Sequence, residues 1–164
     1  MTTGHNIYTR HHRVETSDRL PIPLIKKCIR DTLRLEGVNA RCEVSVLITD
    51  DDGIKRINDD YRGIDKPTDV ISFPMLIFSS PGWFDPGPGA VEQETGSIPL
   101  GEIVISAERA RYQADEYGHS IAWETAYLIV HSVLHLLGYD HVDEAGDKRL
   151  MRNREKEIMK ELGL

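Results

Sequence analysis

The chain has 164 residues, 40% hydrophobic and 29% charged, which fits a single soluble globular domain over residues 1–164. Its amino terminus is polar and no apolar run approaches the ~20 residues of a membrane-spanning helix, so we expect a cytoplasmic protein with no signal peptide and no membrane partner. The formal net charge of −7 argues against broad electrostatic attachment to nucleic acid, and no DNA partner is expected.

Prolines, glycines and the spacing of apolar residues divide the first half of the chain into short elements. Pro21 and Pro23 suit the first turn of a helix that ends at Gly37. The three aspartates at 50–52 suit the start of a second helix, because carboxylates stabilise the positive end of the helix dipole. Strands are expected around these helices, at residues 6–15, 43–49 and 69–73.

The second half begins with a loop at residues 79–97 that carries three prolines and four glycines and is too long for a simple connector. We interpret this loop as an insertion, with a lid over a site as the alternative. A strand at 101–106 then runs into a helix at 107–117, and after Gly118 a further helix follows. A last amphipathic helix begins at Asp143, and its predicted inward-facing residues are Leu150, Met151, Ile158 and Met159.

This order of elements predicts an α+β fold with one small mixed sheet of about four strands covered by about five helices. We expect the first three strands to be joined by right-handed crossovers and therefore parallel, and the fourth strand to pair antiparallel. Cys28 and Cys42 lack CxxC spacing and are expected to be reduced thiols. Charge is uneven: residues 1–42 carry eight basic and four acidic side chains, whereas residues 85–124 carry two basic and eight acidic ones.

The strongest functional motif is the H-x3-H-x5-H pattern of His131, His135 and His141. Residues four apart on a helix project from one face, so the first two imidazoles would aim at a common point. Gly138 can adopt the left-handed conformation that ends a helix, which would let the chain turn back and bring His141 to the same point. Residues 126–130 indicate a buried helix, where two unpaired imidazoles would each cost about 1–3 kcal/mol, so metal ligation is favoured over a core role.

Three neutral imidazoles without a thiolate suit Zn²⁺ best, with Ni²⁺ or Fe²⁺ as alternatives. Three protein ligands leave a fourth position for water, which is typical of catalytic zinc and predicts a hydrolase. The spacing equals that of HExxHxxGxxH proteases, but Ser132 occupies the position of their glutamate base, so proteolysis by that mechanism lacks its base. Asp140 and Glu102 are the candidate acid or base groups, and Asp140 is equally suited to orient a ligand histidine.

The amino-terminal histidines are the competing candidates for metal binding. His5, His11 and His12 lie close together in the sequence, but a solvated strand or arm explains them better than a metal site.

Three blocks of the sequence resemble the YbeY family of bacterial rRNA-maturation endoribonucleases. They are the histidine motif at 131–141, the stretch at 57–74 that contains Arg62, and the stretch at 100–106. Glu102 stands where the family more often has aspartate. Ser132 replaces a usual glycine and is expected to add a hydroxymethyl group near the metal and to narrow substrate access. The loop at 79–97 is longer than typical.

The resemblance implies a metal-dependent, single-strand-specific endoribonuclease. It would act in maturation of the 3′ end of small-subunit rRNA and in ribosome quality control, with single-stranded RNA and the small ribosomal subunit as partners. It also implies that His131, His135 and His141 hold the metal and that Arg62 is the catalytic or substrate-binding arginine, whose guanidinium suits phosphate oxygens. A surface salt bridge to Asp59 or Asp65 is the alternative role for this arginine.

Two other functions remain open on the sequence. One is a metal-dependent hydrolase of a peptide or small-molecule amide bond, and the other is a non-catalytic ribosome assembly factor in which the metal only stabilises the fold. RNA binding by an acidic chain would also require a local basic groove, which we expect around Arg62 and the first helix.

Overall fold

The computed structural model describes residues 4–140 and 145–164. Within these residues the strands are β1 (Asn6–His11), β2 (Cys42–Thr49), β3 (Val70–Pro74) and β4 (Ile98–Ser106). The α-helices are α1 (Ile22–Leu35), α2 (Asp51–Arg62), α3 (Ala107–Tyr117), α4 (Ile121–Leu136) and α5 (Ala145–Glu161), and a short 3-10 helix, η1 (Thr16–Asp18), precedes α1. The predicted α+β fold with one mixed four-stranded sheet is confirmed.

The strands lie in the order β1-β2-β4-β3. As expected, β1 and β2 are parallel and β4 has an antiparallel partner, which is β3. The expectation that the third strand is parallel to the first two is wrong, because β4 also pairs in parallel with β2 and β3 is the antiparallel edge strand. Burial explains the difference, because Ile103, Val104 and Ile105 of β4 are all buried. A strand that is apolar on both faces belongs inside a sheet rather than at its edge.

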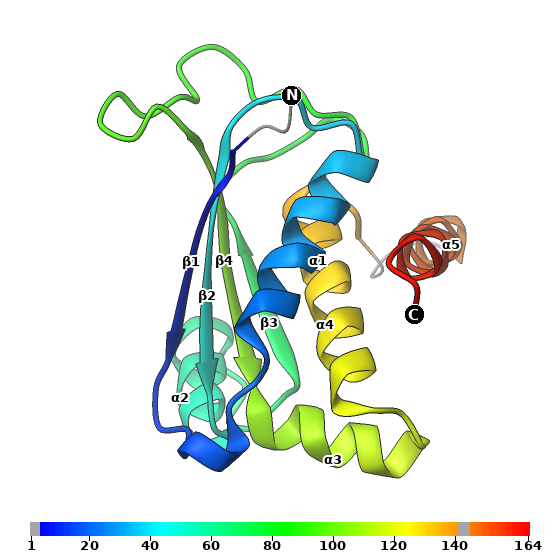
Figure 1. Ribbon diagram of the computed structural model, residues 1–164. Coiled ribbons are helices and arrows are strands. Elements are labelled where there is room, and N and C mark those ends of the chain that lie inside the picture. The colour runs from blue at the N-terminus through cyan, green and yellow to red at the C-terminus, as the bar shows by residue number, and fades with distance from the viewer. Residues whose placement is uncertain (1–3, 141–144) are drawn as a thin grey trace.

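Helices cover the two faces of the sheet unequally (Figure 1). One face packs against α1 and α4, with α5 outside them, and the main core of the protein lies in this layer. The other face carries only α2, near one end of the strands, over a small cluster of Ile54, Ile71 and Val104. The remainder of that face has no helix over it within the described residues.

The helix ends have local signals, and the start of α2 at the aspartates 50–52 is as predicted. The Asp50 side chain accepts a hydrogen bond from the Gly53 amide at the start of α2, and the left-handed Gly63 ends that helix. In α4, Ser120 accepts from the Trp123 amide at the first turn. These local interactions satisfy backbone groups that the helix itself leaves unpaired, so the boundaries are encoded within a few residues of each end.

Two smaller expectations have clear outcomes. Cys28 and Cys42 are buried and unpaired, as predicted. In α5, Met151, Ile158 and Met159 are buried as expected, but Leu150 is 48% exposed, because the buried stripe of the helix runs through residues 151, 155, 158 and 159 and Leu150 lies outside it. None of the described helices has both the length and the apolar character needed to cross a membrane.

The loop at 79–97 is anchored at its start to the turn that follows α4. The Gly82 amide donates to the carbonyl of Leu137, and Phe78 and Phe84 are partly buried against the main core. By contrast, Trp83 is 66% exposed. The choice between an insertion and a lid stays a prediction.

Candidate metal centre

His131 and His135 project from the same face of α4. Their Nε2 atoms are 3.1 Å apart, as expected from the four-residue spacing, and the ring planes meet at 81°. The helix between them is buried, since Val130, Val133 and Leu134 are each 0% exposed, and this packing fixes the direction in which the two imidazoles point. The pair therefore forms two nitrogens aimed at one place.

Each imidazole is held by its other nitrogen. The Nδ1 atom of His131 lies 2.6 Å from Oε1 of Glu155, a residue of α5 that is only 3% exposed. The Nδ1 atom of His135 lies 2.8 Å from the backbone carbonyl oxygen of Tyr139. Tyr127 completes the arrangement by donating its hydroxyl to Oε2 of Glu155 at 2.9 Å.

These contacts determine where the ring protons lie. A carbonyl oxygen only accepts hydrogen bonds, so Nδ1 of His135 carries a proton and donates it, and the Glu155 carboxylate can accept the Nδ1 proton of His131 in the same way. In neutral imidazoles both Nε2 atoms then present lone pairs, 3.1 Å apart, toward the same point. A cation placed between the two nitrogens would accept both lone pairs. The donor set therefore fits a metal ion that prefers imidazole nitrogen, such as Zn²⁺, and the carboxylate behind His131 is a partner that metal-binding histidines commonly have.

The third predicted ligand, His141, lies outside the described residues. Among the described residues no group of three or more His, Cys, Asp or Glu side chains is arranged to hold a metal. The turn that leads to His141 is described, however: Gly138 has φ +94°, and the Tyr139 amide donates back to the Leu134 carbonyl. The helix thus ends at Gly138 in the way that the motif predicts, and the ligand role of His141 stays a prediction.

A groove of about 970 Å³ connects the histidines with Arg62. This groove, which we call the histidine groove, is lined by residues that include Arg62, Asp69, Phe73, His131, His135 and Asp140. Arg62 is the exposed last residue of α2. Within the described part of the chain it forms no ion pair, and Asp65, one of its two suggested partners, instead pairs with Lys55 at 3.7 Å. Its guanidinium is available to an anion in the groove.

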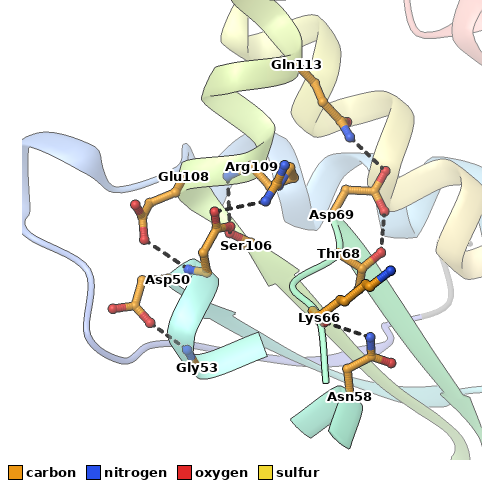
Figure 2. Close-up of polar contacts among 11 residues, drawn as sticks. Asp50, Gly53, Asn58, Lys66, Thr68, Asp69, Ser106, Glu108, Arg109 and Gln113 are labelled. Atoms are coloured by element: carbon orange, nitrogen blue, oxygen red, sulfur yellow. Dashed lines mark hydrogen bonds and ion pairs between the residues drawn. The ribbon is translucent and has the colours of Figure 1, made fainter. Parts of the chain in front are cut away.

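The turn between Arg62 and β3 is fixed by side chains from α2 and α3 (Figure 2). Asn58, which is 3% exposed, donates its amide to the Lys66 carbonyl at 2.9 Å. Asp69 is contacted by the Thr68 hydroxyl and, at 3.3 Å, by the Gln113 amide of α3. These bonds hold the groove wall that Thr68 and Asp69 form, so the position of Arg62 relative to the histidines does not depend on a loose loop.

The structure places the other predicted site residues in different parts of the molecule. Asp140 lines the histidine groove, so it lies where an acid, a base or an orienting group could act. Glu102 is exposed on the α2 side of β4 and lines a different groove, so the structure does not bring it to the histidines. Ser132 is 0% exposed and points into the core, which corrects the expectation that its hydroxymethyl group narrows access to the metal.

Sequence reasoning missed Glu155, the carboxylate that orients His131. A signal for it exists, because Glu155 lies four residues after the buried Met151 and four residues before the buried Met159. A carboxylate in the apolar stripe of an amphipathic helix needs a partner, and a histidine pair on another helix can supply one.

The amino-terminal histidines have structural partners rather than a shared site. The Nδ1 atom of His5 accepts a hydrogen bond from the Cys42 amide at 3.2 Å, and Nε2 of His11 accepts one from the Leu20 amide at 3.3 Å. Burial lowers the pKa of both side chains, which keeps them neutral and able to accept.

Comparison with known proteins gives the family and the fold of the chain. The family model described as "Endoribonuclease YbeY" matches residues 6–163. Proteins named "Endoribonuclease YbeY" from Clostridium kluyveri and from Clostridium botulinum strain Hall are 42% and 43% identical over 163 residues, covering 94% and 96% of this chain and 96% and 97% of theirs. The solution structure of TM1509 from Thermotoga maritima has the same fold, with a TM-score of 0.59 at 24% identity over 94% of this chain and 87% of that one.

Proposed function

Because this chain belongs to the endoribonuclease YbeY family, we propose that it cleaves single-stranded RNA in the histidine groove, with a metal ion held by His131, His135 and His141. Membership of the family makes the protein a nuclease that hydrolyses RNA phosphodiester bonds. The observation that carries the metal proposal is the pair of Nε2 atoms 3.1 Å apart, each on a ring whose Nδ1 atom already contacts another polar group.

The residues of the groove have separate tasks in this proposal. A bound Zn²⁺ ion, or Ni²⁺ or Fe²⁺ in its place, would supply a Lewis acid next to the scissile phosphate. Glu155 and the Tyr139 carbonyl hold the two imidazoles with their Nε2 lone pairs toward that position. Arg62 binds phosphate oxygens and stabilises the negative charge that phosphorus gains in the transition state. Of the two carboxylates among the described residues that line the groove, Asp69 is engaged by Thr68 and Gln113, and Asp140 is the one assigned to exchange a proton or to orient a ligand.

We place this activity in maturation of the 3′ end of small-subunit rRNA and in ribosome quality control, in the cytoplasm and on the small ribosomal subunit. This part of the proposal rests on the family resemblance. Of the other candidate functions, peptide hydrolysis is the weaker, because the position of the protease glutamate is taken by Ser132, which is buried and has no carboxylate. A non-catalytic assembly factor predicts instead that metal removal unfolds the domain and that loss of cleavage leaves ribosome assembly intact.

The deciding experiment measures cleavage of a defined single-stranded RNA by metal-loaded protein, chelated protein and the Arg62→Glu variant, with the metal content of each sample determined. Of these three samples, we expect only the metal-loaded wild type to cleave the RNA. The Arg62→Glu variant should still bind its full complement of metal. Arg56→Glu is the matched control, because Arg56 is an exposed arginine of α2 that does not line the histidine groove. Cleavage by metal-free protein would refute the proposal, and His135→Ala should abolish metal binding.

A further inference from the structure

A second groove of about 570 Å³ lies on the α2 side of the sheet, where the strands are not covered by a helix. It crosses all four strands. One row of paired residues runs along its floor, since Tyr8 is opposite Ser45, Ser45 is opposite Glu102, and Glu102 is opposite Phe73. We call this surface the sheet-face groove. Its floor is a twisted sheet with aromatic rings at both ends of the row and polar side chains between them.

The aromatic rings of this groove are unusually open. Tyr61 is 74% exposed and Tyr8 is 53% exposed. Tyr61 touches Phe73 only edge-on, with ring centroids 5.3 Å apart and planes at 64°, which leaves the faces of the Tyr61 ring uncovered by Phe73. Exposed aromatic faces on a sheet are suited to stacking against flat rings, and the common RNA-binding sheet domains stack two or three bases in this way.

The sheet-face groove continues into the histidine groove. Tyr61 and Phe73 line both, because β3 is the edge strand and the end of α2 lies beside it. A polymer bound beside His131 and Arg62 can therefore pass around this edge and lie across the strands toward β1. Neighbouring strands are about 4.8 Å apart, so the row from β3 to β1 spans roughly 14 Å, enough for two or three nucleotides.

The charged side chains along this path indicate which kind of ligand it binds. Arg62 lies at one end of this path and Arg10 at the other, and within the described residues neither forms an ion pair. Between them Glu102 and Ser45 offer hydrogen-bond acceptors, and the Glu102 carboxylate would repel a phosphate but accept bonds from amino groups of bases. The arrangement suits a strand whose bases face the sheet and whose phosphates contact the arginines at the ends.

We propose that the sheet-face groove binds the segment of single-stranded RNA next to the cleavage site, with bases stacked on Tyr61, Phe73 and Tyr8 and a phosphate held by Arg10. This inference rests on the proposed function, since it extends the same substrate. It assigns Glu102 to recognition of bases rather than to proton transfer. A protein partner is the other occupant that an apolar face could take, and binding of RNAs of different length separates the two.

The test compares Tyr8→Ala with Tyr8→Trp and with Tyr117→Ala. Tyr117 is a matched control, because it is 64% exposed on α3 and lines neither groove. Each metal-loaded protein is assayed on a nested set of RNAs that extend from the cleavage site by a single nucleotide or by about six on either side. Binding of the same RNAs to chelated protein is measured separately by fluorescence anisotropy.

We expect Tyr8→Ala to raise KM and weaken binding about 5- to 10-fold for RNA extended on one side, with kcat unchanged, and to have no effect on the shortest RNA. Tyr8→Trp should restore binding because it retains a stacking face, and Tyr117→Ala should match the wild type. If wild type cleaves RNA but Tyr8→Ala and Tyr117→Ala behave alike on every length, the sheet face does not bind RNA and the inference is wrong while the proposed function stands. If wild type neither binds nor cleaves RNA, both fail.

Discussion

Glu155 is the residue on which the geometry of the proposed metal centre most depends. A carboxylate at 3% exposure is costly unless its oxygens accept hydrogen bonds, and here one oxygen accepts from His131 and the other from the Tyr127 hydroxyl. Burial and the neighbouring Glu155 raise the pKa of Tyr127, so its hydroxyl keeps the proton that it donates. The negative charge behind His131 also makes that imidazole a better ligand for a cation.

Substitution of Glu155 is therefore expected to weaken metal binding without removing a ligand. Glu155→Gln keeps the shape of the side chain but loses its charge, and we expect about a 10- to 100-fold loss of Zn²⁺ affinity. Competition with a chromogenic chelator measures this directly. Glu161→Gln is the control, since Glu161 is an exposed carboxylate at the end of the same helix. Equal affinity of both variants would show that Glu155 has no role in holding His131.

The difference between His135 and Glu155 shows what the sequence could predict at the level of residues. The two histidines are one helical turn apart, so their convergence follows from local geometry alone. Glu155 comes from another helix, and the partner of His135 is a backbone carbonyl of Tyr139. Neither contact has a signature in residue spacing, because one depends on how α5 docks and the other on how the chain turns after α4.

The two cysteines give a prediction about thiol reactivity. Burial raises the pKa of Cys28 and Cys42 to about 12, and the thiolate is the reactive form of cysteine. In the native protein at neutral pH we expect no reaction of either thiol with a colorimetric disulfide reagent over the time in which free cysteine reacts completely. In denaturant two equivalents should react. Rapid native labelling would contradict the burial of these side chains.

At the scale of elements, Gly101 is the position where three pieces of the fold meet. It has φ +147° at the irregularity in the pairing of β2 with β4, and a Cβ there would lie 2.2 Å from the Phe73 carbonyl oxygen and 2.9 Å from Leu136. Backbone atoms of β3 cannot move away without breaking the strand pairing. This glycine lets β3 and the end of α4 approach β4 closely, and so it sets the wall of the histidine groove.

Gly101→Ala should destabilise the protein by about 2–4 kcal/mol, measured as the free energy of unfolding in urea. Gly37→Ala is the control for backbone strain alone, because Gly37 has φ +75° but no atom lies within 4 Å of the place that an alanine methyl group would take there. That variant should lower the free energy of unfolding by only about 1 kcal/mol. Equal losses at the two positions would show that the close approach to Phe73 is not important.

The order of strands shows where sequence reasoning fails at this scale. Helix boundaries were predictable because the caps at Asp50 and Gly63 are local. The direction of β3 was not, because it depends on which strand occupies the centre of the sheet. The apolar run at 103–105 marks β4 as the strand buried on both faces, and this criterion outweighs the expectation that helical crossovers continue through three successive strands.

The anchoring of β1 by His5 and His11 predicts a pH dependence of stability. The pKa of each is lowered from 6.5 by burial and, to a smaller extent, by Arg30 and Arg19 respectively, so the folded protein binds these protons more weakly than the unfolded chain does. The stability that they contribute is therefore complete above pH 6.5 and is lost as the pH falls below it.

This pH dependence is testable by urea unfolding of chelated protein at about pH 7.5 and about pH 5.5. At the higher pH a His5→Asn/His11→Asn double variant should have a lower free energy of unfolding than the wild type. Between the higher and the lower pH, the free energy of unfolding of the double variant should fall less than that of the wild type. His12→Asn is the control, since His12 is exposed. If the double variant and the control respond equally to pH, the two histidines do not anchor β1.

For the whole molecule, the arrangement of charge limits how RNA can bind. The basic side chains of α1 do not reach either groove: no residue of that helix lines them, which corrects the expectation of a basic groove formed with the first helix. Lys27 and Arg34 instead pair with Asp31 on α1 itself. Among the described lining residues, Arg62 is the cation of the histidine groove and Arg10 that of the sheet-face groove.

A protein with net charge −7 and two arginines along its RNA path should bind RNA with a weak dependence on salt. Each phosphate contact to a single strand contributes about −0.7 to the slope of log K against log salt concentration, so a slope of about −1 to −2 is expected. Anisotropy titrations of chelated protein across a salt series give this slope, and Arg10→Ala should reduce its magnitude by about 0.7. A slope steeper than about −4 would mean that RNA contacts a basic surface outside the two grooves. Stacking and the metal ion, rather than a broad positive field, would supply the affinity of this acidic nuclease for its substrate.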